Sequence, residues 1–153
     1  MLETIFEYRA LLAKCERGDG LDVNEIGRLM EIEADYAPRA EGPRGRKFRR
    51  EIVEIDGVLR GDRINDAVEI VEIGPGGIVC RKAPYIARGE QVEIVVDTGD
   101  RIYRLRAQGV WLKDDGEDYK VGLALIGEPL VLRTSKLRSH EADIVDKIVA
   151  AAA

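Results

Sequence analysis

The sequence has few of the side chains on which most enzymes and metal sites depend. Among its 153 residues there is one histidine, His140, and there are two cysteines, Cys15 and Cys80, which lie 65 positions apart. This spacing indicates neither a disulfide framework nor a CxxC metal site. No nucleophile elbow, HExxH motif or Walker loop is present. These absences predict a binding module rather than an enzyme, without a metal or a resident cofactor.

The chain also lacks long apolar runs and any surplus of basic or aromatic residues. No stretch approaches the roughly 20 apolar residues that span a bilayer, and the first residues do not resemble a secretory signal. The formal net charge is −5, the pI is about 5.1 and aromatic residues make up 5%, which argues against a nucleic acid as partner. We therefore expect a cytoplasmic protein with no integral membrane segment.

Residues 1–37 carry the pattern of two short helices. Thr4 with Glu7 fits a capping box. After the Gly18-Asp19-Gly20 stop, Asp22 offers a second N-cap, with Glu25 three residues on. The second helix is expected to end near Tyr36. Helices this short are marginal alone, so the pair should pack as a hairpin on the rest of the protein or on a second copy.

From about residue 51 the apolar period changes from 3.6 to 2, which is typical of strands. Roughly six short strands separated by turn residues predict an antiparallel sandwich or small barrel over residues 51–133. The alternation breaks between Ile70 and Val71, which indicates a bulge. Tyr103, Trp111 and both cysteines are expected in the core, and residues 134–153 return to helical spacing.

Two features suggest a binding site: one lies between the helical and strand regions, and the other lies within the strand region. The segment 38–50, a predicted basic hinge, carries six basic residues against Glu41 alone, and a glycine-rich turn follows at Glu72-Ile73-Gly74-Pro75-Gly76-Gly77. Arginine forks bind phosphates and the guanine edge, while glycines let backbone N–H groups approach an anion closely. A carboxylate such as Glu72 accepts hydrogen bonds from an amino group. Together they suit a guanine nucleotide with phosphates.

These residues resemble the motifs of the PilZ domain, the bacterial receptor module for cyclic di-GMP. Arg46-Lys47-Phe48-Arg49-Arg50 matches its RxxxR motif, and the stretch from Glu72 to Gly77 occupies the place of its D/N-x-S-x-x-G motif. Val121-Gly122-Leu123-Ala124-Leu125 also fits the end of that barrel. The resemblance covers about residues 44–126. It implies a six-stranded antiparallel β-barrel followed by a C-terminal helix, which makes the chain mainly β.

The resemblance also implies a ligand and its binding residues. Arg46 and Arg50 would clamp cyclic di-GMP, Glu72 would take the acidic role and Gly77 would permit the close turn. Glu72 replaces aspartate or asparagine, and Gly74 replaces serine; losing one neutral hydrogen bond costs roughly 0.5–1.5 kcal/mol. We therefore expect weakened cyclic di-GMP binding that is relayed to a protein partner in motility or envelope machinery.

The same two departures leave a second interpretation open. A degenerate PilZ domain would act as an adaptor through protein contacts alone, without nucleotide. The N-terminal helices would then offer the partner surface, and the protein would be a monomer or a homodimer. An enzyme that works through carboxylates or lysine is the least favoured alternative.

Overall fold

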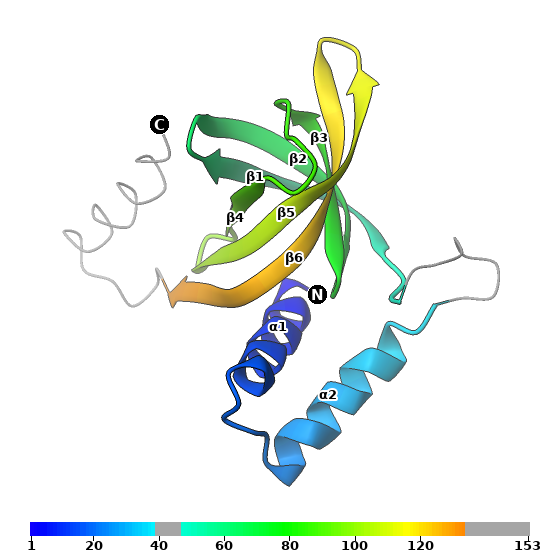
Figure 1. The fold of residues 1–153 in the computed structure, drawn as a ribbon, viewed down its shortest axis with the longest axis vertical. Coiled ribbons are helices and arrows are strands. Elements are labelled where there is room, and N and C mark those ends of the chain that lie inside the picture. Colours follow the sequence, from blue (N-terminus) through cyan, green and yellow to red (C-terminus); the bar gives the residue numbers. More distant parts are fainter. Residues whose placement is uncertain (39–46, 134–153) are drawn as a thin grey trace.

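Six antiparallel strands close into a barrel, and two helices precede it (Figure 1). The computed structural model describes residues 1–38 and 47–133. Its elements are α1 (Leu2–Glu16), α2 (Val23–Asp35), β1 (Glu51–Gly61), β2 (Ile64–Gly74), β3 (Gly77–Ala83), β4 (Gln91–Asp97), β5 (Arg101–Asp115) and β6 (Asp118–Arg133). The predicted mainly β, six-stranded antiparallel barrel is confirmed. The predicted C-terminal helix at 134–153 and residues 39–46 of the predicted hinge lie outside the described residues.

The strands follow the order β1-β2-β3-β6-β5-β4, and pairing of β1 with β4 closes the barrel. Because side chains alternate along a strand, every second residue points inward. The buried interior includes Leu59, Ile73, Ile94, Leu105 and Leu123. The predicted irregularity in β2 is present, since the register with β3 shifts between Ile70 and Glu72.

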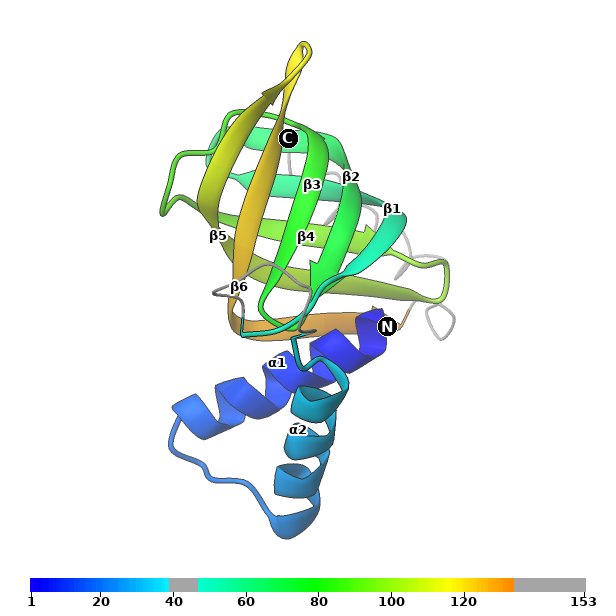
Figure 2. The ribbon, with the colours of Figure 1, turned by 90° about the vertical axis from the view of Figure 1, so that its right-hand side faces the viewer.

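Helix α1 packs its apolar side onto the barrel. Ile5 is fully buried in the same cluster as the barrel interior, and the ring of Phe6 meets that of Tyr103 edge-on at 5.8 Å. The guanidinium of Arg9, buried on this side of α1, donates to the carbonyl of Gly127 in β6 at 3.3 Å. Figure 2 shows α1 beneath the barrel, with α2 forming a V with it and pointing away from the strands.

Helix α2 begins where the sequence predicts it. The carboxylate of Asp22 accepts from the Glu25 N–H at 2.8 Å, and the Glu25 side chain accepts from the Asp22 N–H at 3.0 Å, which completes the predicted capping box. Lys14 of α1 also binds Glu25, at 2.9 Å. The hydrogen bond from the Asp22 N–H, and after it that from Lys14, holds the pKa of the Glu25 carboxyl below its ordinary value. A small apolar cluster of Tyr8, Ile32 and Tyr36 joins the two helices.

Two predictions in the helical part are wrong. Thr4 and Glu7 do not cap α1, because the helix already begins at Leu2 and has Met1 as an N-cap without a side-chain hydrogen bond. Cys15 is exposed rather than buried. It lies near the end of α1, beyond the residues that this helix buries, which extend from Ile5 to Ala13. Cys80 is buried as predicted.

The prediction for Trp111 is also wrong, although Tyr103 is buried as expected. In β5 the register with β6 shifts between Gly109 and Trp111. One extra residue at this point reverses the inward and outward order of the strand. Leu112 therefore packs against the core, while Trp111 is 38% exposed and places its indole against Gly122, where a Cβ would come within 2.1 Å of Nε1.

Candidate functional site

The glycine-rich turn is a tight hairpin between β2 and β3. Gly74 and Gly77 are direct partners at its base, and Pro75 and Gly76 form its tip. The N–H of Leu125 in β6 donates to the carbonyl of Gly76 at 3.1 Å, which fixes the tip against the neighbouring strand. The hairpin is therefore held both by the pairing of its own strands and by β6.

The end of the basic run lies directly over this hairpin. A Cβ at Gly74 would come within 2.8 Å of the Arg49 carbonyl oxygen and 3.2 Å of the Arg50 Cγ. A Cβ at Gly77 would come within 2.7 Å of Arg50 Nη2. Real Cβ contacts are not this short, so the absence of side chains at both glycines is what allows the approach. The structure thus brings the predicted Arg50 and Gly77 together.

This arrangement gives a structural reason for the glycine at position 74. From the sequence, Gly74 is a site that lacks a serine hydroxyl. In the structure the Arg49 backbone and the Arg50 stem occupy the space that such a side chain would need. A serine here would require the basic run to move away from the hairpin.

Glu72 lies on the same outer face of the barrel as Gly74 and Gly77. It pairs with Ile52 of β1 and with Val79 of β3, whereas its neighbour Ile73 points into the core. Glu72 is half-buried. Its carboxylate and the Arg50 guanidinium therefore occupy one side of the sheet, around the base of the hairpin. Arg46, the fourth predicted site residue, lies outside the described residues.

Phe48, the aromatic residue inside the predicted motif, fastens the basic run to the helices. Its ring meets Tyr8 of α1 edge-on at 5.3 Å and lies within van der Waals reach of Gly76, where a Cβ would be 3.5 Å from Cδ2. Phe48 therefore touches both the helical pair and the tip of the hairpin.

Arg49 is a residue whose role the sequence did not indicate. Its Nε and Nη2 donate to the Asp35 carbonyl at 3.1 and 2.6 Å, and its N–H donates to the Tyr36 carbonyl at 2.9 Å. The guanidinium also lies 5.2 Å from the centre of the Tyr36 ring. Arg49 thus binds the C-terminal end of α2, while the next residue, Arg50, contacts the glycine hairpin. Successive side chains of a strand point to opposite sides. This alternation is the signal that could have indicated that Arg49 and Arg50 contact different parts of the protein.

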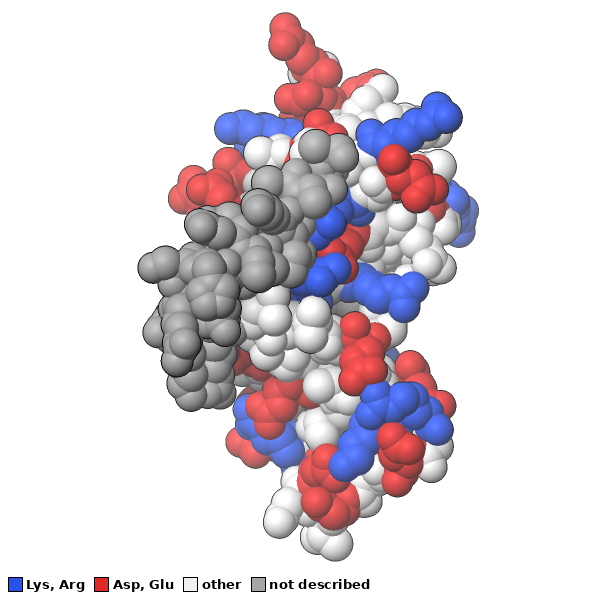
Figure 3. All heavy atoms as spheres, turned by 90° about the vertical axis from the view of Figure 1, so that its left-hand side faces the viewer, with Lys and Arg blue, Asp and Glu red and all other residues white. Residues whose placement is uncertain are grey.

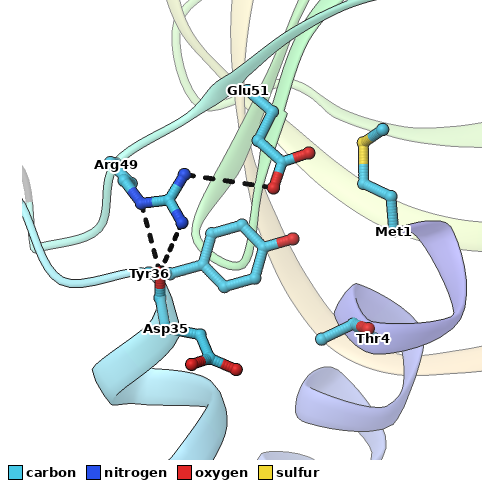
Figure 4. Close-up of a pocket in the computed structure, with 6 residues that line it drawn as sticks. All are labelled: Met1, Thr4, Asp35, Tyr36, Arg49 and Glu51. Carbon is cyan, nitrogen blue, oxygen red and sulfur yellow. Dashed lines mark hydrogen bonds and ion pairs between the residues drawn. The ribbon is translucent and has the colours of Figure 1, made fainter.

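An open pocket of about 450 Å³ lies beside Arg49 (Figure 4). Its lining comes from Met1, Thr4, Asp35, Tyr36, Arg49 and Glu51. Burial and the nearby Glu51 carboxylate raise the pKa of the Tyr36 hydroxyl, so this group is a neutral hydrogen-bonding phenol at physiological pH. The pocket sits between α1, α2 and the start of β1, on the helical side of the basic run.

Two further classes of site concern residues 1–38 and 47–133. Within these ranges no group of three or more histidine, cysteine, aspartate or glutamate side chains is placed to hold a metal ion. No helix in this part of the chain has the length and apolar character to cross a membrane.

The fold and the site define a small closed-barrel protein with a helical pair at its N-terminal side. The sequence matches no protein-family model. It is 37% identical over 79 residues to the co-chaperonin GroES of Caldicellulosiruptor saccharolyticus and of Caldicellulosiruptor bescii, a match that covers 49% of this chain and 75% of each relative. By this identity and coverage, the chain belongs to the co-chaperonin GroES family over the matched half of its length.

Among solved structures, the chain is similar to the Borreliella burgdorferi PlzA protein in complex with c-di-GMP. The two are 10% identical with a TM-score of 0.41, and the similarity covers 83% of this chain and 49% of PlzA. This chain therefore spans about half the length of PlzA.

Proposed function

We propose that this chain is a signalling protein of PilZ type that binds cyclic di-GMP and acts by binding rather than by catalysis. The observation that carries the proposal is the contact of Arg50 with the glycine hairpin. A planar cation, a turn without side chains and the Glu72 carboxylate share one outer face of the barrel. This combination suits a ligand that has both phosphates and guanine.

Each residue has a distinct role in the proposed complex. The Arg50 guanidinium donates paired hydrogen bonds to a phosphate or to the O6 and N7 edge of guanine. Arg46 adds a second fork from the other end of the motif. Glu72 accepts from the guanine 2-amine, and Gly77 permits the close turn and leaves room for the Arg50 guanidinium against the hairpin.

The relay to a partner follows from the neighbouring positions of Arg49 and Arg50. A ligand that draws Arg50 toward itself also pulls on Arg49, which binds the Asp35 and Tyr36 carbonyls at the end of α2. The helical pair then changes its position relative to the barrel. A partner in motility or envelope machinery would recognise that change.

Isothermal titration of the purified protein with cyclic di-GMP, with GTP as the control ligand, tests the proposal. Saturable binding in the micromolar range or tighter, which GTP does not reproduce, supports it. Absence of heat at high micromolar ligand, together with an unshifted melting temperature, overturns it, because a ligand that binds only the native state must stabilise that state.

A second candidate function is action through protein contacts alone. The 37% identity to the co-chaperonin GroES proteins favours it, as does the crowding of Gly74 by the Arg49 backbone. In this case the chain would be a partner of a chaperonin or an adaptor of another assembly. Co-elution with a purified chaperonin from a sizing column, unchanged by Arg50→Ala and by cyclic di-GMP, would favour this function over nucleotide binding.

A further inference from the structure

The outer face of α2 carries apolar residues that nothing in the described part of the chain covers. Val23, Ile26 and Met30 are 84%, 46% and 63% exposed. Ala34 is exposed too, and a Cβ built at Gly27 would meet no neighbour within 4 Å. Because residues three and four positions apart lie on one side of a helix, these five residues form a single stripe, here called the outer stripe of α2.

The outer stripe lies opposite the side of α2 that packs on α1. Ile32 belongs to the cluster with Tyr8 and Tyr36 that joins the two helices. Successive residues of a helix lie about 100° apart, so Ile32 points about half a turn away from Val23 and Met30. Figure 2 shows α2 directed away from the strands. The helix therefore has apolar residues on two opposite sides, and an exposed apolar patch of this kind marks an interaction site.

Two members of the outer stripe suit a helix as the occupant. Gly27 lies at its centre, and a glycine in a helix interior costs stability relative to alanine. No described neighbour crowds this position, so the packing of the described residues does not account for the glycine. Its missing side chain leaves a place where a second helix can approach closely. Met30 lies one turn further on, and its flexible thioether adapts to the shape of a partner.

Acidic side chains border the outer stripe on both sides. Glu31 comes one position after Met30, and Glu33 comes three positions after it. At about 100° per residue these spacings place the two carboxylates on opposite borders of the stripe. Asp35, which is exposed, adds to the border that Glu31 forms. A helix that docks here therefore meets negative charge along both edges.

The basic residues of the helical pair do not neutralise these acids. Residues 1–37 contain nine acidic residues and four basic ones. Arg28 lies 2.8 Å from Glu7 and 3.3 Å from Glu31, so one guanidinium serves two carboxylates. Charged side chains of both signs crowd the helical end of the molecule, in the lower part of Figure 3. The surplus is acidic, and a docking partner must supply the cations.

We propose that the outer stripe of α2 docks an amphipathic helix of a partner protein, with lysine or arginine on both borders of that helix's own apolar stripe. Such a helix matches the acidic borders in charge and the Gly27 position in shape. A second copy of α2 would bring Glu31 and Glu33 against the same acids, and like charges oppose that pairing. The inference rests on the proposed function for the existence of a protein partner but not for nucleotide binding.

Selection of helical peptides against the full chain tests this docking. Each peptide carries leucines at helical spacing, with the positions that border them randomised among lysine, glutamate and serine. Lysine should be enriched at these borders, and the amide resonances that shift on binding should be those of the outer stripe. Ile26→Asp should weaken binding of the enriched peptides by about tenfold or more. Asn24→Asp, which adds the same charge at an exposed position off the stripe, should not.

A charge reversal tests the acidic border directly. Against Glu31→Lys, the enrichment should shift from lysine toward glutamate on the peptide border that faces position 31. No enrichment with the unchanged protein, or a preference that the reversal does not move, overturns the proposal.

Two other occupants of the outer stripe would give distinct results, and each of these results overturns the proposal. Self-association of the chain in sedimentation that Ile26→Asp abolishes would assign the stripe to a second copy. A melting temperature that is lower in Ile26→Asp than in Asn24→Asp would show that the chain covers the stripe itself. All samples are free of nucleotide, so failure of peptide binding and failure of cyclic di-GMP binding are separate outcomes.

Discussion

The guanidinium of Arg50 lies so close to Gly77 that a Cβ there would come within 2.7 Å of Nη2. The same Cβ would lie 2.7 Å from the Leu123 carbonyl oxygen of β6. The first neighbour is a flexible side-chain end and can move, whereas the second is backbone in a paired strand. A side chain at position 77 would therefore collide with the β6 backbone and would displace Arg50 from the barrel.

Substitution of this glycine should damage both stability and ligand binding. Gly77→Ala should lower the free energy of unfolding by about 1–3 kcal/mol, the usual cost of an overpacked position, and should weaken cyclic di-GMP binding. Gly76→Ala is the matched control, since its Cβ would meet Phe48 at an ordinary 3.5 Å. Urea unfolding and calorimetry measure both effects. Equal behaviour of the two variants would contradict the described contact.

Arg49 should stabilise the C-terminal end of α2. Arg49→Ala removes two hydrogen bonds to the Asp35 carbonyl and the contact with the Tyr36 ring, and we expect a loss of about 1 kcal/mol. Amide exchange around Tyr36 should become faster. Arg63→Ala, an exposed arginine in the turn between β1 and β2, should leave both quantities unchanged. If the two variants exchange alike, Arg49 does not hold the helix.

Two glycine-to-alanine substitutions should change the free energy of unfolding in opposite directions. Gly122→Ala places a Cβ within 2.1 Å of the Trp111 indole, so the indole must leave its position and the protein should lose stability. Gly27→Ala lies inside α2 with nothing within 4 Å, and it should gain roughly 0.4–1 kcal/mol. Trp111 is the only tryptophan, so its emission reports the first change directly. An unshifted spectrum in Gly122→Ala would show that the indole does not pack there.

The two cysteines should differ sharply in reactivity. Cys15 is exposed, while burial raises the pKa of the Cys80 thiol to about 12. At about pH 8 the Cys80 thiol stays protonated and inaccessible, and only the thiolate is nucleophilic. Titration with a disulfide reagent should detect one thiol per native chain and two after denaturation. Two rapidly reacting thiols in the native protein would show that β3 opens readily.

Local signals in the sequence predicted much of the fold. They failed where tertiary packing and strand register determine which side chains are buried. The capping box at Asp22 and the glycine hairpin depend on neighbouring residues alone, and both are present. Trp111 was assigned to the wrong face because a register shift after Gly109 reverses the order of side chains. Val110, Trp111 and Leu112 are all apolar, so the pattern at this point fits either face and does not show where the extra residue lies.

In the candidate site, too, some features could be predicted from the sequence and others depend on the tertiary structure. The resemblance to the PilZ motifs pointed to Arg50 and Gly77, and the structure places them in contact. The binding of Arg49 to the end of α2 was missed because it depends on where the helix ends in space. Alternation at the strand entrance separates Arg49 from Arg50, but spacing along the chain does not show which element Arg49 meets.

The most direct test of the central claim is a charge reversal at Arg50 with a matched reversal elsewhere. Calorimetric titration with cyclic di-GMP should show saturable binding to the wild-type protein and to Arg63→Glu. Binding should be absent in Arg50→Glu, whose circular dichroism spectrum should match that of the wild type. Unchanged affinity in Arg50→Glu would contradict the assignment of the site to the glycine hairpin.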